Sequence, residues 1–142
     1  MGAHKDIVFT VMEMCKDGVS GWDFTRENAD IIKQGFPASY VLGFAHLAEA
    51  GHEMSKAGVL HRDLTLANIL VFEDPSLPYP VFKICDFGVS ATEEDKHLLP
   101  RGKMRNYSPE GIESKHGYCP ESDLYSFALM IYEMAHNGYV WK

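Results

Sequence analysis

The chain has 142 residues, of which 46% are hydrophobic and 23% are charged. This composition suffices for one folded core, leaves little room for two domains, and argues against a disordered chain. Thirteen basic and 20 acidic residues give a net charge of −7, which argues against a surface that binds nucleic acid.

The three cysteines, Cys15, Cys85 and Cys119, are far apart in the sequence, and no CxxC pair is present. This pattern indicates neither a zinc site nor a disulfide framework, and it favours a reducing compartment. We expect a cytoplasmic location, or the cytoplasmic part of a larger protein. No apolar run approaches the ~20 residues that a membrane-spanning helix requires. We therefore expect no membrane segment in this chain.

The first predicted element is a buried strand over residues 7–12, because this run is rich in β-branched and aromatic side chains. Two turn pairs, Asp-Gly and Ser-Gly, make residues 13–21 a connector. Residues 22–33 are predicted as a helix. The Gly-Phe-Pro triplet at 35–37 interrupts it, and the proline suits the first turn of another helix.

That second helix is predicted over residues 38–56, where apolar residues recur at helical spacing. They are Val41, Phe44, Ala45 and Ala48. Gly51 weakens the middle of this helix by roughly 1 kcal/mol relative to alanine, and Gly58 is placed to end it.

Two short strands are predicted next, at 69–72 and 81–85, joined by a proline-rich loop at 74–80. Residues 89–108 are polar and lack periodicity, so they are interpreted as a mobile loop. A last helix is predicted over 122–135, apolar nearly all round and therefore buried, and the Asn-Gly pair that follows is predicted to end it.

The most informative motifs are HRDLTLAN at residues 61–68 and DFG at residues 86–88. Asp63 is suited to accept a proton from a hydroxyl nucleophile, and Asn68 and Asp86 offer the hard oxygen ligands that Mg²⁺ prefers. Because the two intervening strands are expected to fold back as a hairpin, both magnesium ligands should reach one cleft.

These motifs match the H-R-D-L-x-x-x-N and D-F-G signatures of protein kinases residue for residue. Two further segments agree in order: Ser-Pro-Glu at 108–110 stands where the family has A-P-E, and Asp-Leu-Tyr-Ser-Phe at 123–127 resembles the start of its long buried helix. The chain therefore resembles a eukaryotic-type protein kinase over essentially its whole length.

The resemblance implies an α+β fold, mainly α, consisting of the kinase C-terminal lobe with the hinge strand and without most of the N-terminal lobe. Residues 1–142 are then one partial domain. Residues 1–12 supply the last small-lobe strand, 13–21 the hinge and linker, and 22–142 the large lobe, which stops after the buried helix. The family's Gly-rich loop and phosphate-anchoring lysine are not found in the sequence.

The implied activity is transfer of the γ-phosphate of ATP, with Mg²⁺, to a protein hydroxyl, with serine or threonine favoured. Asp63 is implied as the catalytic base, and Asn68 and Asp86 as the magnesium ligands. ATP and a protein substrate are the expected partners. Further nucleotide contacts are implied for four residues, which are Met12 as gatekeeper, Glu13 and Cys15 in the hinge, and Leu70 beneath the adenine.

The resemblance implies structural or regulatory roles for His61, Arg62, Phe87, Gly88, Glu110 and Asp123. His61 and Phe87 should stack in the spine between the lobes. Arg62 should reach the activation loop, where it could pair with a phosphate. Asp123 should accept hydrogen bonds from the backbone near Arg62 and so brace the catalytic loop.

One position departs from the pattern of Ser/Thr kinases, which usually carry lysine two residues after the catalytic Asp and threonine in the loop before A-P-E. This chain has Thr65 and Lys103 at those places, as if the two residue types were exchanged. We hypothesise that Lys103 supplies the ammonium group from the opposite side, hydrogen-bonded to Thr65. The alternative is that Lys103 is only a loop cation.

Three other readings remain open. A tyrosine-specific kinase is disfavoured because the receptor type usually has H-R-D-L-A-A-R-N, and this chain has Thr-Leu-Ala at 65–67. A pseudokinase or scaffold is disfavoured by the intact Asp63, Asn68 and Asp86. A small-molecule phosphotransferase is disfavoured by the D-F-G and S-P-E elements. In each case, this fragment alone is expected to be inactive.

Overall fold

The computed structural model describes residues 14–95, 106–112 and 118–137. Within them the chain forms five short strands, five helices and two 3₁₀ turns. In order they are β1 (Val19–Ser20), α1 (Gly21–Glu27), α2 (Ala29–Gln34), α3 (Ala38–Lys56), β2 (Val59–Leu60), the 3₁₀ turn Leu66–Asn68, β3 (Ile69–Phe72), β4 (Val81–Ile84), β5 (Ala91–Thr92), the 3₁₀ turn Glu93–Asp95, α4 (Pro109–Ile112) and α5 (Pro120–Ala135). The predicted class, α+β with mostly helix, is confirmed. The predicted strand over 7–12 lies outside the described residues.

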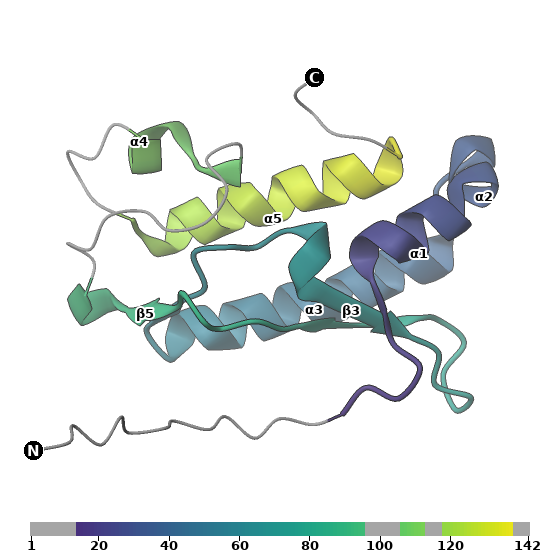
Figure 1. Cartoon of the computed structure of the whole chain (residues 1–142), viewed down its shortest axis with the longest axis horizontal. Helices are drawn as coiled ribbons and strands as arrows, with labels where there is room; N and C mark the ends of the chain where they lie inside the picture. Colours follow the sequence, from purple (N-terminus) through teal and green to yellow (C-terminus); the bar gives the residue numbers. More distant parts are fainter. Residues whose placement is uncertain (1–13, 96–105, 113–117, 138–142) are drawn as a thin grey trace, which may run out of the picture.

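Figure 1 shows the two longest helices, α3 and α5, crossing the molecule with α5 above α3, and with β3 and β5 drawn across α3. The first sheet is antiparallel in the order β1-β3-β4, and α3 packs on β4. The predicted hairpin is confirmed by the β3–β4 register, in which Ile69 pairs with Ile84 and Phe72 with Val81. Strand β4 ends one residue earlier than predicted.

A second sheet was not predicted from the sequence. It consists of β2 and β5, with Val59 opposite Thr92 and Leu60 opposite Ala91. The interpretation of residues 89–108 as a loop is therefore wrong at 91–95, where a strand and a 3₁₀ turn form. A strand of two residues is too short to show the alternation of apolar and polar residues that predicts a strand. Its formation depends on a partner that is distant in sequence.

The predicted helix over 22–33 is in fact two helices, which meet at Asn28. Ser20 caps the first, accepting a hydrogen bond from the backbone N–H of Asp23 at 3.1 Å. At the junction the Asn28 side chain donates to the carbonyl of Phe24 at 2.9 Å and accepts from the Tyr40 hydroxyl at 3.0 Å. This local competition with the helical hydrogen bonds explains the break.

Helix α3 has the predicted bounds, but its buried face differs from the predicted one. Val41 is 55% exposed, and Ala45 and Ala48 are also exposed. The buried residues of α3 are Tyr40, Gly43, Phe44 and Leu47. Phe44 is buried as predicted, whereas Val41, Ala45 and Ala48 are not, because the contact face includes Tyr40 and Gly43, which hydropathy does not single out.

Helix α5 begins two residues before its predicted start, because Pro120 occupies its first turn after the N-cap residue Cys119. It ends at Ala135 as predicted, and Asn137 follows in the left-handed region with φ of +48°. It is not buried all round, since Leu124 is 65% exposed and Tyr132 is 49% exposed.

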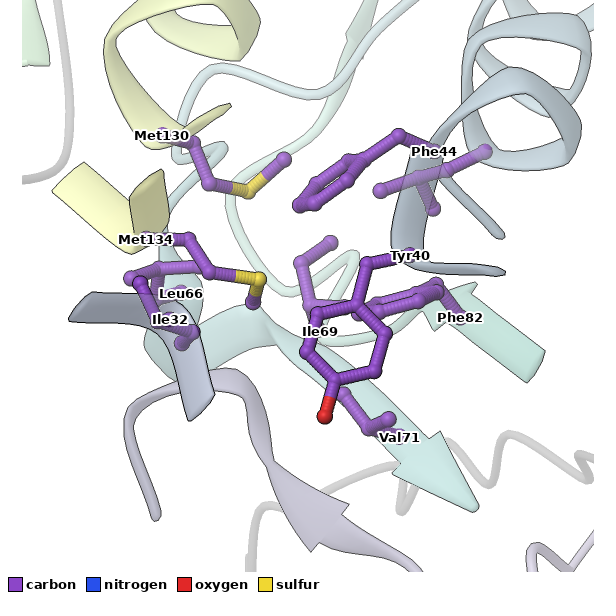
Figure 2. Close-up of a cluster of buried hydrophobic side chains, with 10 residues drawn as sticks. Ile32, Tyr40, Phe44, Leu66, Ile69, Val71, Phe82, Met130 and Met134 are labelled. Carbon is purple, nitrogen blue, oxygen red and sulfur yellow. The ribbon is translucent and has the colours of Figure 1, made fainter. Parts of the chain in front are cut away.

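The main core lies where α3, α5 and the first sheet meet. Its members are Ile32, Tyr40, Phe44, Leu47, Leu66, Ile69, Val71, Phe82, Met130 and Met134. Figure 2 shows Met130 and Met134 pointing from α5 into this cluster, and both are fully buried. The rings of Phe44 and Phe82 stack with centroids 4.8 Å apart. This core fixes the start of β3 and therefore the loop that precedes it.

Candidate active site

The HRDLTLAN segment connects β2 to β3 and places Asn68 beside Asp63. The 3₁₀ turn Leu66–Asn68 closes with a hydrogen bond from the Asn68 N–H to the Thr65 carbonyl at 2.9 Å. The Asn68 side-chain nitrogen then donates to the Asp63 carbonyl at 2.8 Å and to Asp63 Oδ2 at 2.9 Å. The fully buried Leu66 anchors the turn in the core.

These bonds also settle the orientation of the Asn68 amide. Both partners of its nitrogen are acceptors, so the nitrogen must face Asp63. The Asn68 carbonyl oxygen, Oδ1, is therefore directed away from Asp63. On Asp63 itself, Oδ1 has no hydrogen-bond partner within the described part of the chain, although this atom is buried.

The β3–β4 hairpin brings the DFG motif to the same place. The backbone N–H of Cys85 donates to the Asn68 carbonyl at 2.9 Å, so Asp86 follows directly after a residue bonded to Asn68. Asp86 has φ of +63°, in the left-handed region, which turns the chain out of the strand. Its exposed carboxylate accepts one hydrogen bond, from the Gly88 N–H to Oδ1 at 3.2 Å.

His61 connects the HRD segment to the DFG motif through contacts of its ring. Its ring contacts the ring of Phe87, with centroids 4.9 Å apart. Because the Asp63 N–H donates to His61 Nδ1 at 3.3 Å, the ring proton is assigned to Nε2, which donates to the Cys85 carbonyl at 3.1 Å. One imidazole thus ties the HRD segment to the residue that precedes the DFG motif.

The buried Asp123, in the first turn of α5, holds the backbone of the same segment. Its Oδ2 accepts from the His61 N–H at 2.7 Å, and its Oδ1 accepts from the Arg62 N–H at 3.0 Å. Arg62 has φ of +71°, a conformation that costs a non-glycine residue free energy and persists only where neighbours stabilise it. The carboxylate supplies that stabilisation through charge-assisted hydrogen bonds.

Sequence reasoning missed the polar residues around the hydrogen bonds between Asp123 and the HRD backbone. The Tyr118 hydroxyl donates to Asp123 Oδ1 at 2.6 Å. Ser126 donates to the Asn106 carbonyl at 2.6 Å, and Ser108 donates to Ser122 at 3.1 Å. The available signal was two serines four residues apart in a largely apolar helix, since such polar residues need partners when buried.

The other predicted site residues differ in their burial, and some lie outside the described residues. Thr65 is buried, while Cys15 and Leu70 are half-buried. Burial, with smaller contributions from Asp86 and Cys15, raises the pKa of the Cys85 thiol. Glu110 lies in α4. Three other predicted site residues, Met12, Glu13 and Lys103, lie outside the described residues.

The structure thus joins Asp63 to Asn68 through side-chain hydrogen bonds, and joins Asn68 through its backbone carbonyl to the residue that precedes Asp86. Comparison with known proteins identifies the family. The sequence profile of the protein kinase domain matches residues 2–142, and the chain belongs to this family. In the described part of the chain, no helix is both long and apolar enough to cross a membrane.

Individual relatives agree with the family. The chain is 42% identical over 80 residues to serine/threonine-protein kinase A of Synechocystis sp., covering 54% of this chain and 15% of that protein. It is 32% identical over 130 residues to serine/threonine-protein kinase PLK4 of Xenopus tropicalis, covering 88% and 12%. It is 32% identical over 89 residues to dual specificity protein kinase zakA of Dictyostelium discoideum, covering 57% and 11%. The chain thus spans only a small part of the length of these relatives.

Proposed function

We propose that the protein carrying this domain transfers the γ-phosphate of ATP to a serine or threonine hydroxyl of a protein substrate. The observation that carries the proposal is the position of Asn68. Its side chain holds Asp63, and its backbone carbonyl holds the residue before Asp86. Phosphoryl transfer depends on positioning and charge neutralisation. Asp63, Asn68 and Asp86 are proposed to offer both.

Asp63 is proposed as the group that accepts the proton of the substrate hydroxyl. Its Oδ2 is fixed by the Asn68 amide at 2.9 Å, while Oδ1 has no partner among the described residues. A general base needs one oxygen that is oriented but unoccupied, within reach of the nucleophile. The Asp63 carboxylate is oriented and its Oδ1 is unoccupied, but Oδ1 is buried, so the proposal requires that substrate binding expose this oxygen.

Asn68 and Asp86 are proposed as the ligands of Mg²⁺. The residues fit this ion, because the Asn68 amide oxygen and the Asp86 carboxylate are hard oxygen donors that their own hydrogen bonds leave open. Across the described ranges, no group of three or more His, Cys, Asp or Glu side chains gathers as a metal site. When bound, the metal would neutralise phosphate charge. With two protein ligands, Mg²⁺ would leave room for nucleotide phosphates and water molecules in its coordination shell.

The base of the nucleotide is proposed to lie over Leu70, against the hinge residues Glu13 and Cys15 and beside Met12 as gatekeeper. Pairing of β1 with β3 places Ser20 opposite Leu70, so the segment leading from the hinge enters beside the proposed adenine floor. We also propose the division predicted from the sequence, with residues 1–21 as last small-lobe strand and hinge and 22–142 as large lobe. The cytoplasmic location stays a prediction.

Saturating Mg-ATP is expected to raise the melting temperature of this chain. A ligand at 100 times its dissociation constant adds about 2.7 kcal/mol to the free energy of unfolding of a protein that binds it only when folded. Thermal unfolding is measured with Mg-ATP, with ATP and EDTA, and without ligand. Only the first condition should give the full increase, because the phosphates and the metal bind together.

Two variants make this measurement specific to the proposed site. Asp86→Asn should remove most of the magnesium-dependent increase. Asp30→Asn, which neutralises an exposed carboxylate on α2, should leave it unchanged. An equal increase in both variants would contradict the proposed metal ligand. A cooperative melt that Mg-ATP does not shift would mean that useful affinity requires segments outside this chain.

Catalysis is proposed for the whole protein, and residues 1–142 alone are proposed to be inactive, because the family's phosphate-anchoring lysine is not in the sequence. Phosphoamino-acid analysis of a phosphorylated substrate decides the acceptor. Phosphoserine or phosphothreonine is expected. Phosphotyrosine alone would favour the tyrosine-specific alternative, and no transfer by the whole protein would favour the pseudokinase.

The proposed exchange of Thr65 and Lys103 predicts a particular pattern of rescue. Lys103→Ala should lower turnover by roughly 10²–10³-fold, as removal of one charge-stabilising donor does. Thr65→Lys alone should also be impaired, because it would place a second ammonium group beside that of Lys103 at a buried position, and like charges repel. The double variant, Thr65→Lys with Lys103→Thr, should recover activity. Turnover of the double variant no higher than that of either single variant would refute the exchange.

A further inference from the structure

The hydroxyl group of Tyr118 lies against the carboxylate that supports the catalytic loop. Its oxygen is 2.6 Å from Asp123 Oδ1, and the same carboxylate oxygen accepts from the Arg62 N–H at 3.0 Å. Both side chains are buried, with Tyr118 2% exposed and Asp123 6% exposed. Water is therefore not available to replace either donor at this oxygen.

Tyr118 can act only as a donor in this position. Burial and the neighbouring carboxylate of Asp123 raise the pKa of Tyr118 far above that of an exposed tyrosine, so its phenol keeps its proton at physiological pH. A neutral hydroxyl donating to a buried carboxylate forms a short, charge-assisted hydrogen bond. That bond fixes the rotation of the carboxylate about its Cβ–Cγ axis.

The location of Tyr118 in the chain connects this hydrogen bond to two other segments, α5 and the segment before α4. Tyr118 immediately precedes Cys119, the N-cap residue of α5, and its ring contacts the ring of Tyr107 with centroids 6.4 Å apart. Tyr107 belongs to the segment just before α4. Ser108 attaches this segment to α5, and the Asn106 side chain attaches it to the Leu64 carbonyl. Tyr118 therefore lies between that segment and the backbone that precedes Asp63.

We propose that Tyr118 is a positioning residue for the HRD segment. Its phenol holds the Asp123 carboxylate in the one orientation in which both oxygens meet the amides of His61 and Arg62. Because Arg62 is held at φ of +71° by these bonds, loosening the carboxylate loosens the backbone that carries Asp63. The catalytic consequence rests on the proposed function, whereas the structural coupling does not.

Amide hydrogen exchange in Tyr118→Phe tests the coupling directly. The variant keeps the ring and its packing and removes only the hydroxyl. We expect the His61 and Arg62 amides to lose about tenfold in protection relative to the Val71 and Met134 amides, which lie in the core. Tyr107→Phe removes a phenol from the same cluster and is expected to leave the ratio unchanged. An equal loss at all four amides, or no loss at His61 and Arg62, would overturn the proposal.

Two further measurements separate positioning from packing. In an Asp123→Asn background, adding Tyr118→Phe should cause no further relative loss at the Arg62 amide, and an undiminished tenfold loss would contradict the proposed route. In the unmodified chain, NMR should detect a slowly exchanging Tyr118 hydroxyl proton with a nuclear Overhauser effect to the Arg62 amide. Its absence would overturn the proposal even if the variants fail to fold.

A kinetic measurement on the whole protein keeps the two proposals apart. Tyr118→Phe should lower kcat and leave the KM for ATP unchanged, since the phenol bonds to Asp123 and is not among the residues proposed to bind the nucleotide. If the whole protein transfers no phosphate, the proposed function fails while the exchange result still decides the role of Tyr118. If transfer occurs and the His61 and Arg62 amides are unaffected, only the role of Tyr118 fails.

Discussion

Replacing Asp63 by asparagine is expected to lower the turnover of phosphoryl transfer by about 10²–10⁴-fold, the usual contribution of a general base. The substitution keeps the shape of the side chain, and an asparagine oxygen can still accept from the Asn68 amide where Asp63 Oδ2 now does. It removes the group that takes the proton at Oδ1. Steady-state kinetics of the whole protein with a peptide substrate measures the loss.

The Asp63→Asn result needs evidence that the rest of the site is intact. The Mg-ATP melting increase should be retained, since Asp63 is not among the proposed metal ligands, and Asp30→Asn should have normal turnover. If Asp63→Asn were as active as the unmodified protein, Asp63 could not be the base. If the unmodified whole protein and its Asp63→Asn variant were both inactive, the pseudokinase alternative would be favoured.

Replacing Gly43 by alanine is expected to destabilise the fold by about 2 kcal/mol, although alanine is the better helix former by roughly 1 kcal/mol. A Cβ at Gly43 would lie 2.3 Å and 2.4 Å from two ring atoms of Phe82 and 2.7 Å from the Pro80 carbonyl oxygen. The ring has little room to withdraw, because it stacks on Phe44 and contacts Phe24 edge-on. Urea unfolding followed by circular dichroism measures the change.

Gly51 offers the matched control in the same helix. A Cβ at Gly51 meets nothing within 4 Å, so Gly51→Ala should gain up to about 1 kcal/mol from helix propensity alone. The two variants should therefore differ in the direction of their effects on the urea midpoint. Equal midpoints would show that the contact between α3 and Phe82 yields without cost, contrary to the packing described above.

The elements that the sequence predicted well are those whose signals lie within the element or directly beside it. The bounds of α3 follow from Pro37 before it and Gly58 after it, and the β3–β4 hairpin follows from β-branched runs separated by a proline-rich turn. The order of groups in HRDLTLAN and DFG predicted that Asp63, Asn68 and Asp86 share one site, and the structure bonds Asn68 to Asp63 and to Cys85, the residue before Asp86. The hydrogen bonds through Asn68 then arise over five residues, within a single turn.

What the sequence could not supply depends on distant partners. Strands β2 and β5 have two residues each and exist only because they pair with one another. The break at Asn28 requires the Tyr40 hydroxyl, and the role of Tyr118 requires a carboxylate that also serves the HRD backbone. None of these contacts leaves a periodic trace in one sequence. Met12, Glu13 and Lys103 lie outside the described residues, so their roles remain predictions.

The pairing of β2 with β5 has a consequence for how the site forms. Asp63, Asn68 and Asp86 all lie between Leu60 and Ala91, which face each other in that pair. The stretch that carries them is thus a closed loop, and the entropy of closing it is lost once for all three residues. Opening the pair would release both ends together. The proposed base and the proposed metal ligands should therefore become ordered, and lose order, as one cooperative unit.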